Sequence, residues 1–119
     1  MIAVIFEARP AKGKWDEYLD MAADLRPELN QIDGFISIER FQSISDPAKI
    51  LSLSFWKNEE SITKWRNIGL HRQAQTKGRS AVFSDYRLRV AAVVRDYGMN
   101  ERAEAPTDSI IIHDKKQLP

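Results

Sequence analysis

The sequence predicts an α+β fold of four strands and two helices in the order βαββαβ. Runs of β-prone apolar residues form the four candidate strands, at residues 2–9, 35–43, 50–56 and 80–95. Apolar side chains recur every three or four residues from Trp15 to Leu29, which indicates a helix between the first two strands. A second helical segment separates the last two. This order is the ferredoxin-like plan, an antiparallel sheet with both helices on one face.

The ends of these elements have local causes. Pro10 stops the first strand, and Pro27 is expected to kink or end the first helix because it lacks an amide proton. Gly34 follows an aspartate and marks a turn. Asn58 is a suitable N-cap for the second helix. Gly69 interrupts that helix, so residues 71–77 are expected to form a further turn or two.

The first and last strands of the chain are apolar on both sides. In the first strand Ile2, Val4 and Phe6 point one way, whereas Ala3 and Ile5 point the other. A single sheet carrying helices on one face would have polar residues on the other. The second face is therefore expected to be covered, most simply by the same face of a second copy in a two-fold homodimer.

The chain has 119 residues, which suits one small domain. We assign residues 1–98 to that domain and residues 99–119 to a polar C-terminal tail. Within the tail, the compact apolar run at residues 109–112 is expected to add as a short strand to a sheet edge, because an exposed run would promote aggregation.

Composition excludes several classes of function. Lys and Arg total 18 and Asp and Glu total 17, so no net charge draws the chain to nucleic acid or to an acidic membrane. The absence of cysteine excludes disulfides and thiolate nucleophiles. With no basic leader and no long apolar run at the start, we expect a cytoplasmic protein without a membrane partner. The two histidines have no acidic cluster nearby, which predicts no metal site.

Several segments together suggest a family. The chain resembles the antibiotic-biosynthesis monooxygenase superfamily over about residues 1–98, and the resemblance rests on residues 34–40, 51–56, 65–67, 71–72 and 85–86. It implies a dimeric α+β barrel, in which two ferredoxin-like sheets close around each other. Members include cofactor-independent oxygenases of aromatic substrates, haem-degrading monooxygenases and quinol oxygenases, so the resemblance specifies the fold better than the substrate.

Two branches of the family can be compared residue by residue. The quinone-forming branch has a helix Trp four residues after an Asn and six before a Tyr. Here Trp65 matches, while Ser61 and His71 stand at the other two positions. The haem-degrading branch has the Trp, an iron-ligating His ten residues later and an Asn in the first strand. Gln75 and Glu7 stand near those two positions, which argues against haem as a cofactor.

The candidate site residues also have structural interpretations. Trp65 is either a core aromatic or a pocket wall whose indole N–H binds a substrate oxygen. His71 is either a helix-end histidine or a general base that deprotonates a phenol. Arg66 and Arg72 are either solvated or hold an anionic substrate oxygen. Aromatic residues expected to line the space between sheet and helices are Phe6, Phe35, Phe55, Trp56 and Phe83.

The sequence therefore predicts a cofactor-independent monooxygenase that acts with dioxygen on a small phenolic or quinol-like ligand. Trp65 would orient the substrate, His71 would act as base, and Ser61 would be a secondary hydrogen-bond donor. A non-catalytic dimer that binds an apolar small molecule in the same place is the alternative, and a haem-binding protein is a third hypothesis.

Overall fold

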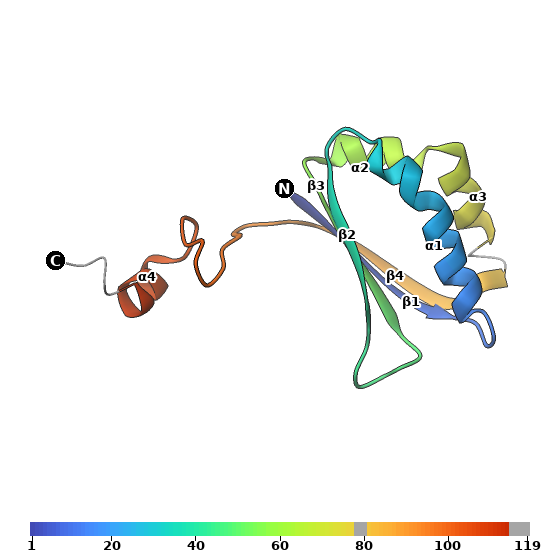
Figure 1. Cartoon of the computed structure of the whole chain (residues 1–119), viewed down its shortest axis with the longest axis horizontal. Coiled ribbons are helices and arrows are strands. Elements are labelled where there is room, and N and C mark those ends of the chain that lie inside the picture. The colour runs from blue at the N-terminus through green and yellow to red at the C-terminus, as the bar shows by residue number, and fades with distance from the viewer. Residues whose placement is uncertain (78–80, 115–119) are drawn as a thin grey trace.

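The computed structural model describes residues 1–77 and 81–114. Figure 1 shows one sheet, a layer of helices beside it and a C-terminal segment that leads away from both. The elements in chain order are β1 (Ile2–Pro10), α1 (Trp15–Asn30), β2 (Phe35–Gln42), β3 (Ile50–Trp56), α2 (Glu59–Arg66), α3 (Gly69–Lys77), β4 (Phe83–Ala92) and α4 (Thr107–His113).

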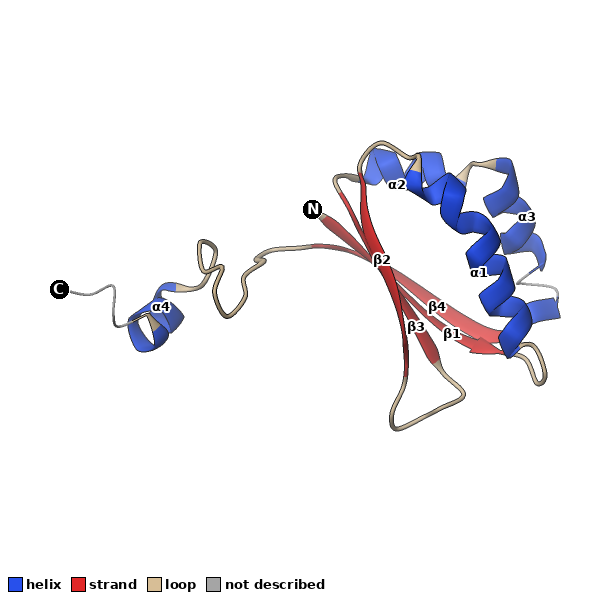
Figure 2. Ribbon diagram, in the orientation of Figure 1, coloured by secondary structure: helices blue, strands red, loops and turns tan. Residues whose placement is uncertain are grey.

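The sheet confirms the predicted α+β, ferredoxin-like fold. Its strand order is β2-β3-β1-β4, and each neighbouring pair is antiparallel. Figure 2 shows α1, α2 and α3 together on one face of this sheet. We call this the helix face and the opposite one the open face.

Alternation along β3 sets which side chains meet the helices. Ile50, Ser52, Ser54 and Trp56 are buried, and the residues between them are only half-buried. The buried set belongs to the helix face, since successive side chains point to opposite faces. Two of its members are serines, and Ser54 is satisfied there because its Oγ accepts a 2.9 Å hydrogen bond from the Trp56 indole N–H. Trp56 is only 1% exposed, so its ring anchors the sheet against the helices.

The core has two parts, one at each end of the space between sheet and helices. At one end the buried residues are Ala8, Tyr18, Ile50 and Val82, with Phe6, Trp15, Met21 and Phe83 packed against them. At the other end they are Leu29, Trp56 and Ile62, with partners that include Val4, Phe35, Ile38 and Trp65. Because α1 contributes Tyr18 to the first part and Leu29 to the second, this helix spans both.

The helices differ in detail from the expectations. α1 continues through Pro27 to Asn30, so this proline does not end it. The predicted second helix is two helices, and the chain breaks from helical geometry at Asn67 and Ile68, just before Gly69. The predicted last strand is shorter, from Phe83 to Ala92. Its expected first residue, at position 80, lies outside the described residues.

The C-terminal segment contradicts the expected edge strand at residues 109–112. These residues lie in α4, which stands apart from the sheet (Figure 1). Pro106 precedes the helix and Asp108 lies in its first turn, where a carboxylate is favourable. Local start signals and contacts therefore outweigh the β propensity of three consecutive isoleucines. Across the described residues, we find no helix that is both long and apolar enough to cross a membrane.

Candidate functional site

Trp65 and His71 lie against each other. Trp65 is in the last turn of α2 and His71 in the first turn of α3, and their ring centroids are 4.4 Å apart with the planes tilted by 32°. Both side chains are half-buried. Trp65 packs against the core beneath α2. Within residues 1–77 and 81–114 its indole N–H has no hydrogen-bond partner, so this donor is available to a ligand.

One nitrogen of His71 is fixed by the backbone. Its Nδ1 lies 3.0 Å from the carbonyl oxygen of Trp65, and a carbonyl only accepts, so Nδ1 carries the proton in the neutral ring. The second nitrogen, Nε2, is then a lone-pair acceptor without a partner among the described residues. Burial lowers the pKa of His71 below its ordinary value, and the positive charges of Arg72 and Arg66 lower it further, against the opposing effect of the Trp65 carbonyl. A neutral imidazole with a free Nε2 is suited to accept a proton near neutral pH.

Ser61 stabilises the N-terminus of α2. Its Oγ donates to Asn58 Oδ1 at 2.9 Å, and its backbone N–H donates to the same oxygen at 3.0 Å. Its side chain also lies against Gly34, where an added Cβ would come within 2.0 Å of the Ser61 Oγ. The hydroxyl proton predicted to serve a substrate is thus engaged in the N-cap of the helix that carries Trp65.

Phe6 and Phe83 belong to an aromatic cluster on the helix face. Their ring centroids are 5.5 Å apart in an edge-to-face arrangement, and Tyr86 lies 5.5 Å from Phe6. Tyr18 of α1 meets Phe83 at 5.3 Å. Tyr18 and Tyr86 join the predicted phenylalanines in this wall, and the two-residue spacing of Tyr86 from Leu88 on one strand face was a usable signal for Tyr86.

The other two phenylalanines lie elsewhere. Phe35 meets Trp56 edge-to-face at 5.3 Å in the second part of the core. Phe55 is on the open face, because its neighbour Trp56 occupies the helix face and adjacent strand residues point to opposite sides. The expectation that all five aromatic residues line the space between sheet and helices is therefore wrong for Phe55.

The helix face of β4 is uncovered at Leu88 and Val90. The register pairs Leu88 with Phe6 and Val90 with Val4, so both belong to the helix face. They are nevertheless 57% and 42% exposed. Exposed apolar side chains thus lie between the aromatic cluster at one end and the core near Trp65 at the other, and such a surface suits an apolar ligand.

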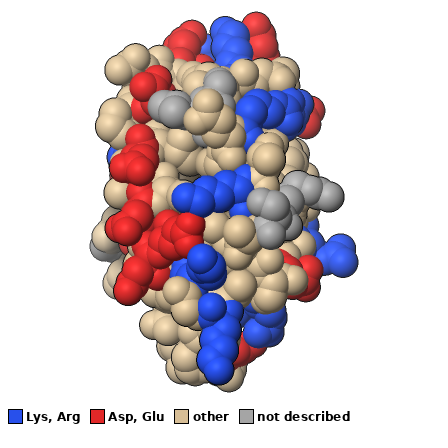
Figure 3. Space-filling view, turned by 90° about the vertical axis from the view of Figure 1, so that its right-hand side faces the viewer, with Lys and Arg blue, Asp and Glu red and all other residues tan. Residues whose placement is uncertain are grey.

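Arg66 and Arg72 are exposed on the outer side of the helices. Arg72 donates to Gln75 Oε1 at 3.1 Å and to Asn67 Oδ1 at 2.7 Å. Arg72 also lines a surface hollow of about 460 Å³ with Gln73, Thr76 and Lys77. Figure 3 shows acidic side chains gathered along one side of the molecule, with basic ones beside them. The two arginines act on His71 by charge, and no described contact turns them toward the rings of the aromatic cluster.

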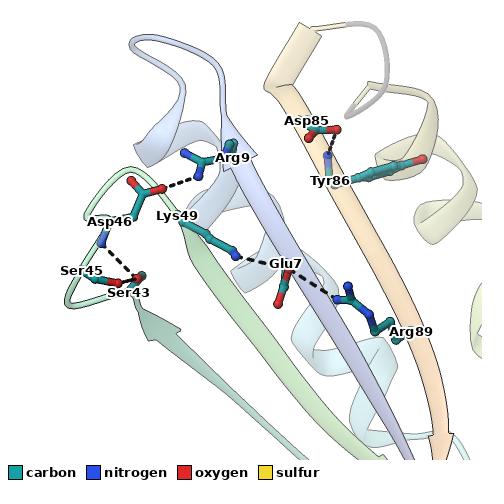
Figure 4. Close-up of polar contacts among 9 residues, drawn as sticks. All are labelled: Glu7, Arg9, Ser43, Ser45, Asp46, Lys49, Asp85, Tyr86 and Arg89. Atoms are coloured by element: carbon teal, nitrogen blue, oxygen red, sulfur yellow. Dashed lines mark hydrogen bonds and ion pairs between the residues drawn. The ribbon is translucent and has the colours of Figure 1, made fainter.

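Glu7, which stands near a family position in the first strand, lies on the open face. It pairs with Lys49 at 3.3 Å and with Arg89 at 3.5 Å, as Figure 4 shows. The hydrogen bond from Lys49 is the main reason that the pKa of Glu7 lies below its usual value, and the positive charges of Lys49 and Arg89 lower this pKa further. Arg40 of β2 donates from Nε to the Tyr18 hydroxyl at 3.3 Å.

A family model described as antibiotic biosynthesis monooxygenase matches residues 1–77 of this chain. Among curated proteins, "Jasmonate monooxygenase ABM" of Pyricularia oryzae is 52% identical over 101 residues, which are 85% of this chain and 47% of that protein. The Bacillus subtilis protein YqjZ, uncharacterised, is 32% identical over 62 residues, 52% of this chain and 53% of that protein. The chain thus spans about half the length of these two relatives.

Solved structures share the fold. A protein of Deinococcus radiodurans, described as a candidate antibiotic biosynthesis monooxygenase, superposes with a TM-score of 0.73 at 12% identity. The superposition covers 82% of this chain and 97% of that one. At this level of identity the match speaks for the fold alone, and it leaves about a fifth of the present chain without a counterpart.

Proposed function

The chain belongs to the antibiotic biosynthesis monooxygenase family, and on that premise we propose that it is a homodimeric monooxygenase that uses dioxygen without a bound cofactor. Its substrate would be a small phenolic or quinol-like molecule, held on the helix face between the Trp65–His71 pair and the aromatic cluster of Phe6, Phe83 and Tyr86. The observation that carries the proposal is the contact between the His71 and Trp65 rings, whose centroids are 4.4 Å apart, with His71 Nε2 and the Trp65 indole N–H both without a hydrogen-bond partner among the described residues.

The reaction needs a base and little else from the protein. Nε2 of His71 takes the proton of a substrate hydroxyl, and the resulting phenolate is electron-rich enough to reduce dioxygen. In the anthrone type of substrate, a CH₂ carbon becomes a carbonyl. One oxygen atom enters the product, the other leaves as water with the two hydrogens, and the substrate supplies all the electrons. The Trp65 indole N–H donates to a substrate oxygen and fixes its orientation.

The roles of the remaining predicted residues follow their positions. Ser61 acts as a positioning residue, because its hydroxyl holds the N-cap of the helix that bears Trp65. Phe35 supports the same end of the core through Trp56. Burial lowers the pKa of His71, and the positive charges of Arg72 and Arg66 lower it further. Phe55, with Ile5 and Leu53, belongs to the open face through which we propose that two copies pair.

The test is a substitution that removes the base and keeps its hydrogen bond. In His71→Asn, the amide N–H takes the place of Nδ1–H toward the Trp65 carbonyl, but nothing replaces Nε2. We expect turnover to fall by about 10²- to 10⁴-fold, the usual contribution of a general base. Oxygen uptake is measured with dihydroxyanthrone-type phenols, hydroquinones and jasmonate, the last because the Pyricularia oryzae relative is named for it.

Trp65→Phe is the companion variant, since it keeps an aromatic ring against His71 and removes only the N–H. Unchanged turnover in both variants would contradict the assigned roles. A thermal-shift measurement with the same compounds separates catalysis from binding. Stabilisation of the wild-type chain without oxygen uptake would mean that the site binds small molecules and does not oxidise them.

A further inference from the structure

The described residues after β4 form an arm, which we define as residues 93–114. Its first residue is anchored to the sheet, because the Val93 N–H donates to the carbonyl oxygen of Met1 at 3.0 Å. From there the chain runs out as an extended segment, and α4 stands apart from the helix layer at its far end (Figure 1). The arm therefore owes little of its structure to the rest of its own chain.

Contacts within the arm give it a defined shape. Arg102 donates from Nε to Asp114 Oδ1 at 3.2 Å, from Nη2 to Ser109 Oγ at 2.9 Å, and from Nη1 to the Gly98 carbonyl at 3.1 Å. The Arg102 and Asp114 side chains are only 17% and 11% exposed. Ala105 is buried at 6% exposure. The arm is thus a small built unit with an ion pair at its centre.

The outer surface of this unit carries several large apolar side chains. Ile111 and Ile112 of α4 are 55% and 60% exposed, and Val94 and Met99 are 86% and 92% exposed. A short segment that shields the Arg102–Asp114 ion pair and leaves four large apolar side chains exposed has the pattern of an interaction surface.

The reach of the arm selects a second copy of this chain as the partner. Residues 93–98 in extended form cover roughly 20 Å, at about 3.3 Å per residue. Two sheets packed face to face are about 10 Å apart, so a second copy on the open face lies well within that reach. α4 would then come to the level of the helix layer of this second copy. The net charges of the two parts are also complementary. The arm is negative, with five acidic and two basic residues, whereas residues 1–92 are positive, with fourteen basic and twelve acidic ones.

We propose that the arm crosses to the second subunit and packs Ile111 and Ile112 against it, so that each subunit clasps the other. This inference rests on the homodimer of the proposed function and goes beyond it, because face-to-face pairing alone would leave both arms free.

The absence of cysteine makes a direct test possible. Ile111→Cys carries a single benzophenone maleimide label, which links on illumination to whatever lies beside α4. At micromolar concentration we expect a covalent product of twice the chain mass on a denaturing gel. The matched control is Lys12→Cys, an exposed position in the turn before α1, with the same label, and it should give the single chain.

Light scattering of the unlabelled wild-type chain separates the possible failures. A dimer whose Ile111 label links only within its own chain would overturn the arm exchange and leave the dimer intact. A monomer would overturn both the arm exchange and the homodimer. Oxygen uptake would still test the proposed monooxygenase activity separately. As a second measurement, Ile111→Asp should raise the dimer dissociation constant by at least about tenfold. Thr107→Asp, on the same helix and exposed, should leave it unchanged, and equal effects of the two would contradict the proposal.

Discussion

His71 is held in its neutral form by its surroundings, and this has a consequence for stability. Burial is the main reason for its lowered pKa, and Arg72 and Arg66 add to it. In the unfolded chain the group returns to its ordinary value of about 6.5. Between the two values the unfolded state binds more protons than the folded one. The stability that a neutral His71 contributes is therefore complete above the unfolded pKa and is lost as pH falls through the folded pKa.

We therefore expect the free energy of unfolding to decrease as the pH falls below about 6.5. In His71→Asn this part of the pH dependence should disappear, because no titrating group remains at the site. Urea unfolding of both proteins at pH 5, 6, 7 and 8 measures the difference. The paired carboxylates of Glu7, Glu17 and Asp46 have lowered pKa values and titrate below this range. If the free energy of unfolding depends on pH in the same way in both proteins, the pKa of His71 is not lowered by folding.

The meeting of Trp65 and His71 could be predicted only in part. On an unbroken helix, residues six apart lie about 240° apart around the axis, so their side chains do not face each other. The break at Asn67 and Ile68 turns the chain and brings the rings together. Gly69 signalled an interruption, but the direction of the turn depends on contacts such as Asn67 Nδ2 to the Thr63 carbonyl, which sequence patterns do not specify.

At the scale of elements, the packing of β2 against α2 depends on one glycine. Gly34 has φ +93°, a conformation unfavourable for other residues, and the space for a Cβ is taken by Ser61. Gly34→Ala should cost about 1–2 kcal/mol for the backbone conformation and about 1–3 kcal/mol for overpacking. Gly13→Ala is the matched control, because Gly13 has φ +78° with no atom within 4 Å of the added Cβ.

Thermal or urea unfolding of the two glycine variants separates the contributions. We expect Gly13→Ala to show the conformational cost alone, and Gly34→Ala to be the less stable of the two. Equal losses would mean that Ser61 moves aside freely and that the contact with α2 carries no stability.

The main elements could be predicted because local patterns agree with the fold, whereas the failures occur where distant or local contacts override a pattern. Runs of β-prone apolar residues identified β1 and β3, and the residue spacing identified α1. Three isoleucines in a row indicated a strand, but Pro106 and the Arg102 contacts place them in α4. Phe55 was assigned to the wrong face of the sheet. The sequence of β3 shows that its residues alternate, but it does not show which of the two alternating sets faces the helices. Two of the inward positions are serines.

At the scale of the molecule, the sheet has two faces with different partners. The helix face has its own helices, except over Leu88 and Val90 of β4. Among the described residues no helix covers the open face, yet its centre is apolar. Register pairs Ile5 with Leu53 and Ala3 with Phe55, so these four side chains form one surface. Ala3 is only 7% exposed, and the other three are half-buried. An ordered apolar centre with the Glu7 ion pairs at one end of the strands is suited to bind an identical face across a two-fold axis.

A charge at the centre of this surface should separate the subunits. In Phe55→Asp a carboxylate would be buried without a partner in the proposed dimer, at a cost of about 3–5 kcal/mol. That raises the dissociation constant by more than about 100-fold. Ala23→Asp, on the exposed side of α1, adds the same charge away from the open face and should leave the dimer unchanged. Light scattering over a concentration series gives the mass, and far-ultraviolet circular dichroism shows whether the separated subunit keeps its fold. If Phe55→Asp remains a dimer at the lowest concentration at which the wild type does, the subunits do not pair through the open face.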